Sequence, residues 1–117
     1  MHATFGQALR EFRRKAGMSQ RDLAQRVGID FSYISKVEND RIPPPAADTV
    51  VAMCQALGIP QEELLALIGK IPSEAEKAIA NSPGGQGFLR EVQELNLSDD
   101  EWKKIRAALS QLRKASQ

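Results

Sequence analysis

The chain has 117 residues, a net charge of +1, and 42% hydrophobic and 26% charged residues, which favour one compact soluble domain or a small domain with an appended module. No apolar run approaches the ~20 residues of a membrane span, and the first residues lack the apolar core of a signal peptide, so we expect a cytoplasmic protein without membrane contact. The single cysteine, Cys54, excludes a disulfide within this sequence and is expected to be a small buried hydrophobe.

Positive charge gathers in the first third of the chain. Residues 1–41 contain eight Lys/Arg against five Asp/Glu, a net charge of +3, whereas residues 42–70 carry −2 and residues 71–117 are neutral. The excess therefore lies at the N-terminal end, where a phosphate-binding surface would need it.

Apolar spacing and capping residues predict one helix after another, without strand alternation. Phe5, Leu9 and Phe12 recur at four- and three-residue spacing, which places them on one face of a helix. The expected N-caps of later helices are Ser19, Asp30, Asp48, Ser73 and Ser98. An acidic residue three positions later predicts a capping box at the three serines. The expected left-handed glycines that end helices are Gly17, Gly28, Gly58 and Gly69.

The most informative segment runs from Ser19 to Asn39 and contains two short capped helices joined by a tight turn at Gly28. Such a pair packs at a steep angle, so the second helix projects from the body and fits a major groove ~12 Å wide. Its inward positions, Ile34 and Val37, are apolar. Its outward positions, all able to contact a base or a phosphate, are Phe31, Ser32, Ser35 and Lys36.

This segment resembles the phage-repressor (Cro/cI, or Xre) helix-turn-helix family. The matching pieces are LREFRRKAGMSQRDLAQRVGI, SYISKVEND, ALGI and EELLALI, which lie within residues 5–69. The resemblance implies an all-α fold, with a five-helix lambda-repressor-like DNA-binding domain over residues 1–70, and the apolar spacing beyond it predicts a small C-terminal helical module. The resemblance also implies a sequence-specific transcriptional regulator that binds double-stranded DNA. No catalytic grouping stands out in the sequence, so we do not expect an enzyme.

The resemblance implies roles for single residues. Ser32 and Lys36 match positions that contact base edges, and Ser35 lies on the same exposed face. Phe31 stands where family members often carry a polar residue such as glutamine; its ring is a candidate for contact with a thymine methyl group, which leaves the base preference open. The expected phosphate contacts are Gln20, Arg21, Asn39 and Arg41. The expected structural pair, which bridges the first helix to the end of the third, is Arg13 and Glu38.

Each contact has a plainer interpretation. Lys36 and Arg21 are also compatible with solvated surface side chains, and Ser32 and Ser35 with tolerated polar residues. Arg10 is also compatible with a position on the solvent-exposed face of the first helix, without a specific contact.

The C-terminal third is expected to contain a short helix and a Gly-rich hinge over residues 71–87, followed by a helical module over 88–117. In the last helix an apolar stripe repeats at three-, four- and three-residue spacing: Trp102, Ile105, Leu109 and Leu112. Two interpretations stay open for this stripe. It forms a dimerisation or partner-binding surface, or it folds back onto the fifth helix and completes the core.

These features favour a homodimeric repressor on a palindromic operator, because one helix-turn-helix contacts only one half-site. The alternative is an antitoxin or protease-regulated repressor whose C-terminal helices bind a toxin or a metalloprotease. No cofactor and no metal are expected. The only histidine is His2, at a terminus, and the acidic run at 99–101 follows the N-cap Ser98.

Overall fold

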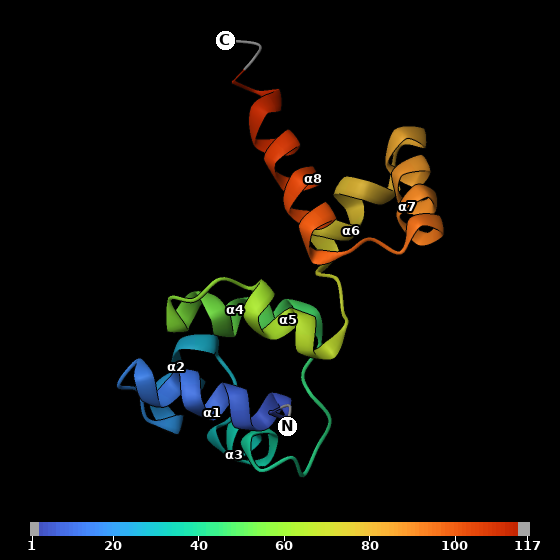
Figure 1. Ribbon diagram of the computed structural model, residues 1–117. Helices are drawn as coiled ribbons and strands as arrows, with labels where there is room; N and C mark the ends of the chain where they lie inside the picture. The colour runs from blue at the N-terminus through green and yellow to red at the C-terminus, as the bar shows by residue number, and fades with distance from the viewer. Residues whose placement is uncertain (1–2, 115–117) are drawn as a thin grey trace. The chain divides into compact units, whose positions relative to one another are not determined.

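The computed structural model describes residues 3–114, which contain eight α-helices and no strand (Figure 1). The all-α prediction is confirmed. Packing divides the chain into two units between Glu76 and Lys77. The first unit holds α1 (Phe5–Lys15), α2 (Gln20–Val27), α3 (Phe31–Glu38), α4 (Ala47–Leu57), α5 (Glu62–Ile68) and the start of α6 (Ser73–Ala80). The second unit holds the rest of α6, α7 (Pro83–Leu95) and α8 (Asp99–Leu112).

The first unit is built around a mainly aliphatic core, in keeping with a sequence in which only 5% of residues are aromatic. Helix α1 packs against α3 and α5, α2 packs against α3 and α4, and α4 packs against α5. The fully buried apolar side chains are Leu9, Leu23, Ile34, Val37, Val50, Met53, Cys54 and Leu64. Full burial of one such side chain contributes about 1.5–3 kcal/mol. The inward faces of α2 and α3 are therefore fixed by packing against this core.

Local hydrogen bonds set where α2 and α3 begin. The Ser19 hydroxyl accepts from the backbone N–H of Asp22 at 3.0 Å, and the Asp22 carboxylate accepts from the N–H of Ser19 at 3.0 Å. The Asp30 carboxylate accepts from the N–H of Ser32 at 2.9 Å and caps α3. Between the two helices Gly28 has φ +80°, a left-handed conformation that glycine adopts at low cost. The predicted caps on both helices are confirmed.

Two other predicted N-caps, Asp48 and Ser73, are wrong. Helix α4 begins one residue before Asp48, and its N-cap, Ala46, makes no side-chain hydrogen bond. The Asp48 carboxylate instead accepts from both the N–H and the hydroxyl of Ser73, at 2.9 and 2.6 Å. The carbonyl of Pro72 accepts the N–H of Glu76, so the predicted capping box at Ser73 is absent. A partner 25 residues away outcompetes the local bond, which local sequence patterns do not reveal.

The Gly-rich segment predicted as a hinge is helical. Helix α7 begins at Pro83, a residue favoured in the first helical turn, and Ser82 caps it by accepting from the N–H of Gly85 at 3.0 Å. Gly85 lies so close to α6 that a Cβ there would collide with the carbonyl of Ile79. The glycine thus permits close packing of two helices. The division into 1–70, 71–87 and 88–117 stays a prediction.

Among the residues of the second unit that the structure describes, no buried core is present. None of the described side chains that α6, α7 and α8 carry is fully buried. Along the predicted stripe, Trp102 is 39% exposed, Leu109 60% and Leu112 65%, and Ile105 is half-buried. None of the helices described here is long and apolar enough to cross a membrane.

Candidate nucleic-acid interface

Helix α3 has a buried side and an open side. Ile34 and Val37 point into the core and are at most 1% exposed. The four residues predicted to contact bases lie on the other side: Phe31, Ser32 and Lys36 are exposed and Ser35 is half-buried. A short helix fixed from behind, with polar and aromatic side chains in front, can enter the major groove.

The N-terminal end of this open side is ordered by Asp30. Its carboxylate oxygen Oδ1 accepts from both the N–H and the hydroxyl of Ser32, at 2.9 and 3.1 Å. The backbone hydrogen bond from Ser32, followed by that from its side chain, lowers the pKa of Asp30. The carboxylate therefore stays charged at neutral pH and directs the Ser32 hydroxyl proton toward itself.

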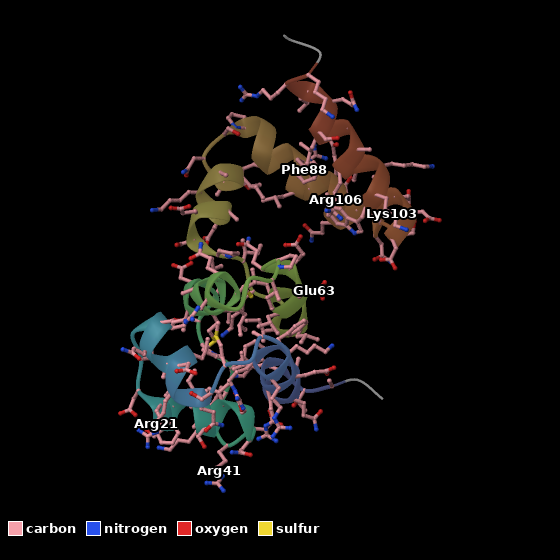
Figure 2. All side chains as sticks on the ribbon, turned by 90° about the vertical axis from the view of Figure 1, so that its left-hand side faces the viewer. Arg21, Arg41, Glu63, Phe88, Lys103 and Arg106 are labelled. Atoms are coloured by element: carbon pink, nitrogen blue, oxygen red, sulfur yellow. The ribbon has the colours of Figure 1, made fainter. Side chains whose placement is uncertain are left out.

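Two arginines border the same surface. Arg21, in the first turn of α2, places its guanidinium over the ring of Phe31, with Cζ 4.4 Å from the ring centroid. Arg41 follows α3 and is exposed. Figure 2 shows both arginines at the margin of the first unit that α2 and α3 form. Positive charge thus flanks the open side of α3, as contact with phosphates requires.

A buried ion pair joins α1 to the end of α3. The Glu38 side chain is fully buried and accepts two hydrogen bonds from Arg13, at 2.6 and 2.9 Å. Arg13 also donates to the carbonyl of Met18 at 2.8 Å. Burial raises the pKa of Glu38, but the hydrogen bonds from Arg13 and Gln20 and the charge of Arg13 outweigh it, so this pKa is lowered. The hydrogen bond to Glu38 raises the pKa of Arg13.

Two predicted phosphate contacts take part in this network. The side-chain amide of Gln20 donates to Glu38 at 3.0 Å. Asn39 donates to the carbonyl of Ser35 at 2.8 Å and accepts from Arg10 at 2.6 Å. Sequence analysis missed the role of Arg10, which also donates to Glu38 at 3.4 Å. The available signal is its position three residues before Arg13, on the same face of α1.

The described part of the chain contains no cluster of metal-ligating side chains. Within residues 3–114 no three His, Cys, Asp or Glu side chains gather to hold a metal ion, and His2 lies outside these residues. Cys54 is buried, and its burial, followed by the charge of Glu62, raises the pKa of its thiol to about 11. The thiol is therefore protonated and inert at neutral pH.

Comparison with known proteins agrees with this geometry. Residues 4–67, more than half of the chain, match the family described as helix-turn-helix domain. The HTH-type transcriptional regulator RghRB of Bacillus subtilis (strain 168) is 37% identical over 82 residues, which cover 70% of this chain and 59% of that protein. The propionyl-CoA carboxylase regulator of Cereibacter sphaeroides is 33% identical over 76 residues, which cover 65% of this chain and 15% of that protein. Each match thus covers less than two thirds of the relative's own length. The chain belongs to the helix-turn-helix domain family.

Proposed function

We propose that this protein is a cytoplasmic, sequence-specific DNA-binding transcriptional regulator of the phage-repressor (Cro/cI, Xre) type. It acts as a homodimeric repressor on a palindromic operator. One observation carries the proposal: α3 is buried on one side and presents Phe31, Ser32 and Lys36 on the other. The names of the two relatives, both regulators, support the same class of function.

In this proposal α3 contacts the bases and its neighbours contact the backbone. The ammonium group of Lys36 donates to guanine O6 or N7. Arg21 and Arg41 neutralise phosphates, because both are exposed at the margin of the same surface. Gln20 and Asn39 each use one amide N–H inside the protein and keep the second for a phosphate oxygen. The network at Glu38 thus orients two phosphate contacts.

A second copy of the chain is the proposed occupant of the open apolar side of the second unit. Helix α8 begins with three acids, over residues 99–101, and is followed at its C-terminal end by Arg113 and Lys114. Two α8 helices that pair antiparallel over their full length bring the acidic start of each against the basic end of the other. The same pairing covers Trp102 and Leu109.

Selection of bound duplexes from a random DNA pool tests DNA recognition. The expected product is an inverted repeat. On that operator Lys36→Ala should lose about 1–3 kcal/mol and relax preference at one base pair in each half-site. The matched control Arg41→Ala should weaken cognate and random DNA alike and reduce the salt slope by about 0.9 for each phosphate that the variant no longer neutralises. Equal losses on both DNAs for Lys36→Ala would contradict its role.

Sedimentation tests the dimer. The full chain should sediment as a dimer, whereas Trp102→Ala combined with Leu109→Ala should give a monomer that binds single half-sites. Leu67→Ala is the matched control, because Leu67 is 47% exposed but belongs to α5 in the first unit. A double variant that remains dimeric would place the dimer surface elsewhere.

A second candidate function rests on the same open side. If the wild-type chain is monomeric and still binds DNA, the apolar residues of α8 are proposed to bind another protein. The chain is then an antitoxin or a protease-regulated repressor, with a toxin or a metalloprotease as partner. Stoichiometric binding of such a purified partner, lost in the Trp102 and Leu109 variant, would support this alternative.

A further inference from the structure

The stacked pair of Arg21 and Phe31 points to more than a phosphate contact. Arg21 comes from the first turn of α2, and Phe31 is the first residue of α3. Their 4.4 Å separation, guanidinium carbon to ring centroid, is well inside the ~6 Å over which a cation and an aromatic face attract. The contact joins the two helices at the end of the surface proposed to enter the groove.

Stacking leaves the rest of both groups available. The Arg21 guanidinium has five N–H donors, and its contact with the ring face engages none of them in a hydrogen bond. Among the described residues, none accepts a hydrogen bond or forms an ion pair with the Arg21 side chain. Phe31 remains 37% exposed although Arg21 covers part of it. The pair therefore offers an oriented ring and unused donors side by side.

We infer that Arg21 is a positioning residue for Phe31, and that the pair recognises the methyl group of a thymine beside a backbone phosphate. This inference rests on the proposed function and deepens it. In the major groove only thymine among the four DNA bases presents a methyl group, and an apolar ring is a suitable partner for it. With Arg21 on one face, the ring presents its remaining surface to the groove in a fixed orientation. The unused N–H groups of Arg21 bind the adjacent phosphate.

The test removes the methyl group from the DNA. Each thymine of the selected operator is replaced singly by deoxyuridine, which keeps the base-pairing atoms and lacks only the 5-methyl group. The wild-type protein should lose about fourfold in affinity at one thymine in each half-site, which corresponds to the ~0.8 kcal/mol of one buried carbon group. The other thymines should change affinity by less than twofold.

Variants then separate the ring from the charge. Phe31→Ala should bind the thymine and uracil operators equally. Arg21→Ala should lose most of the thymine preference and also bind both operators more weakly. Arg21→Lys should keep the salt dependence of binding, because the charge remains, but lose much of the thymine preference, because a compact ammonium does not replace the guanidinium over the ring. Lys36→Ala is the control and should keep the full fourfold preference.

Each outcome bears on a distinct claim. Specific DNA binding with no thymine that responds to methyl removal overturns the inference and leaves the proposed function standing. Arg21→Ala with undiminished thymine preference overturns the positioning role of Arg21. Absence of any DNA binding by the wild-type protein overturns the proposed function itself. The circular dichroism spectrum of every variant should match that of the wild type, since the side chains of Arg21, Phe31 and Lys36 are exposed.

Discussion

The two units use the same local signals but differ in how their helices are covered. Each helix from α1 to α5 buries side chains in a shared core, whereas none of the described side chains of α6 to α8 is buried. Yet α8 has a complete capping box at Ser98 and Glu101, equivalent to that of α2. Caps define where a helix begins, but tertiary packing supplies most of its stability. The helices of the second unit therefore have less tertiary packing to stabilise them than those of the first.

The largest expected effect is the gap in stability between the units. The chain carries one natural probe in each, because its single cysteine, Cys54, is buried in the first unit and its single tryptophan, Trp102, lies in the second. At low protein concentration we expect the fluorescence of Trp102 to change at a low denaturant concentration. Cys54 should become reactive toward a thiol reagent only at a higher denaturant concentration. The free energy of unfolding of the first unit should exceed that of the second by about 5 kcal/mol, which is the lower end of the stability of a native domain.

Protein concentration sharpens this comparison. If a second copy covers the second unit, the fluorescence midpoint should rise with concentration while Cys54 protection stays constant. Coincident transitions at all concentrations would contradict the comparison and favour the other interpretation of the stripe, in which it completes the core.

The next effect concerns the buried ion pair of the first unit. Arg13→Ala leaves the fully buried Glu38 without its two shortest hydrogen bonds and should lower the free energy of unfolding by about 3–5 kcal/mol. The control is Lys15→Ala, which breaks the exposed pair with Glu11 and should cost less than about 1 kcal/mol. Similar losses for both variants, measured by Cys54 protection, would show that burial of the pair does not matter.

A smaller effect is expected where α1 crosses α3. A Cβ at Gly6 would collide with the carbonyl of Val37 and lie 2.8 Å from that of Glu38, so Gly6→Ala should cost about 1–3 kcal/mol. Gly84→Ala is the control, because nothing lies within 4 Å of its Cβ position in α7. It should be neutral or slightly stabilising. A Gly6→Ala protein as stable as the wild type would contradict the close crossing.

The smallest effects come from matched caps. Ser19→Ala and Ser98→Ala each remove one capping box, worth about 1 kcal/mol. Ser19→Ala should shift the protection of Cys54 and leave the Trp102 transition unchanged. Ser98→Ala should do the reverse. A variant that moves both transitions equally would show that the units unfold together.

Much of this structure follows from signals within a few residues of each other. The helical periodicity of α1, the capping box at Ser19 and the glycine turn at Gly28 all act locally, and the sequence predicted each of them. The exposure of Ser32 and Lys36 followed from the same periodicity, since Ile34 and Val37 had to face inward. Their roles in contacting DNA stay predictions.

Long-range partners could not be predicted in this way. Both the residue type and the position of Asp48 are typical of an N-cap, but its carboxylate accepts a hydrogen bond from Ser73. Arg10 lies where a solvated arginine is expected, but its guanidinium donates to Asn39. The stack of Arg21 on Phe31 depends on the angle between two helices, which periodicity does not specify. A glycine-rich run predicted a hinge, although Pro83 and the contact of Gly85 with Ile79 favour a helix.

The bonds between Asp30 and Ser32 determine which way the Ser32 hydroxyl points its proton as well as where α3 begins. While the hydroxyl proton is held by the carboxylate, the serine oxygen has only lone pairs to offer an approaching duplex. Adenine and cytosine present exocyclic amino donors in the major groove, whereas guanine O6 and thymine O4 are acceptors. Replacing the aspartate by a residue whose side chain accepts no hydrogen bond would free the hydroxyl to donate. If α3 contacts bases as proposed, Asp30 thus governs which bases Ser32 can accommodate.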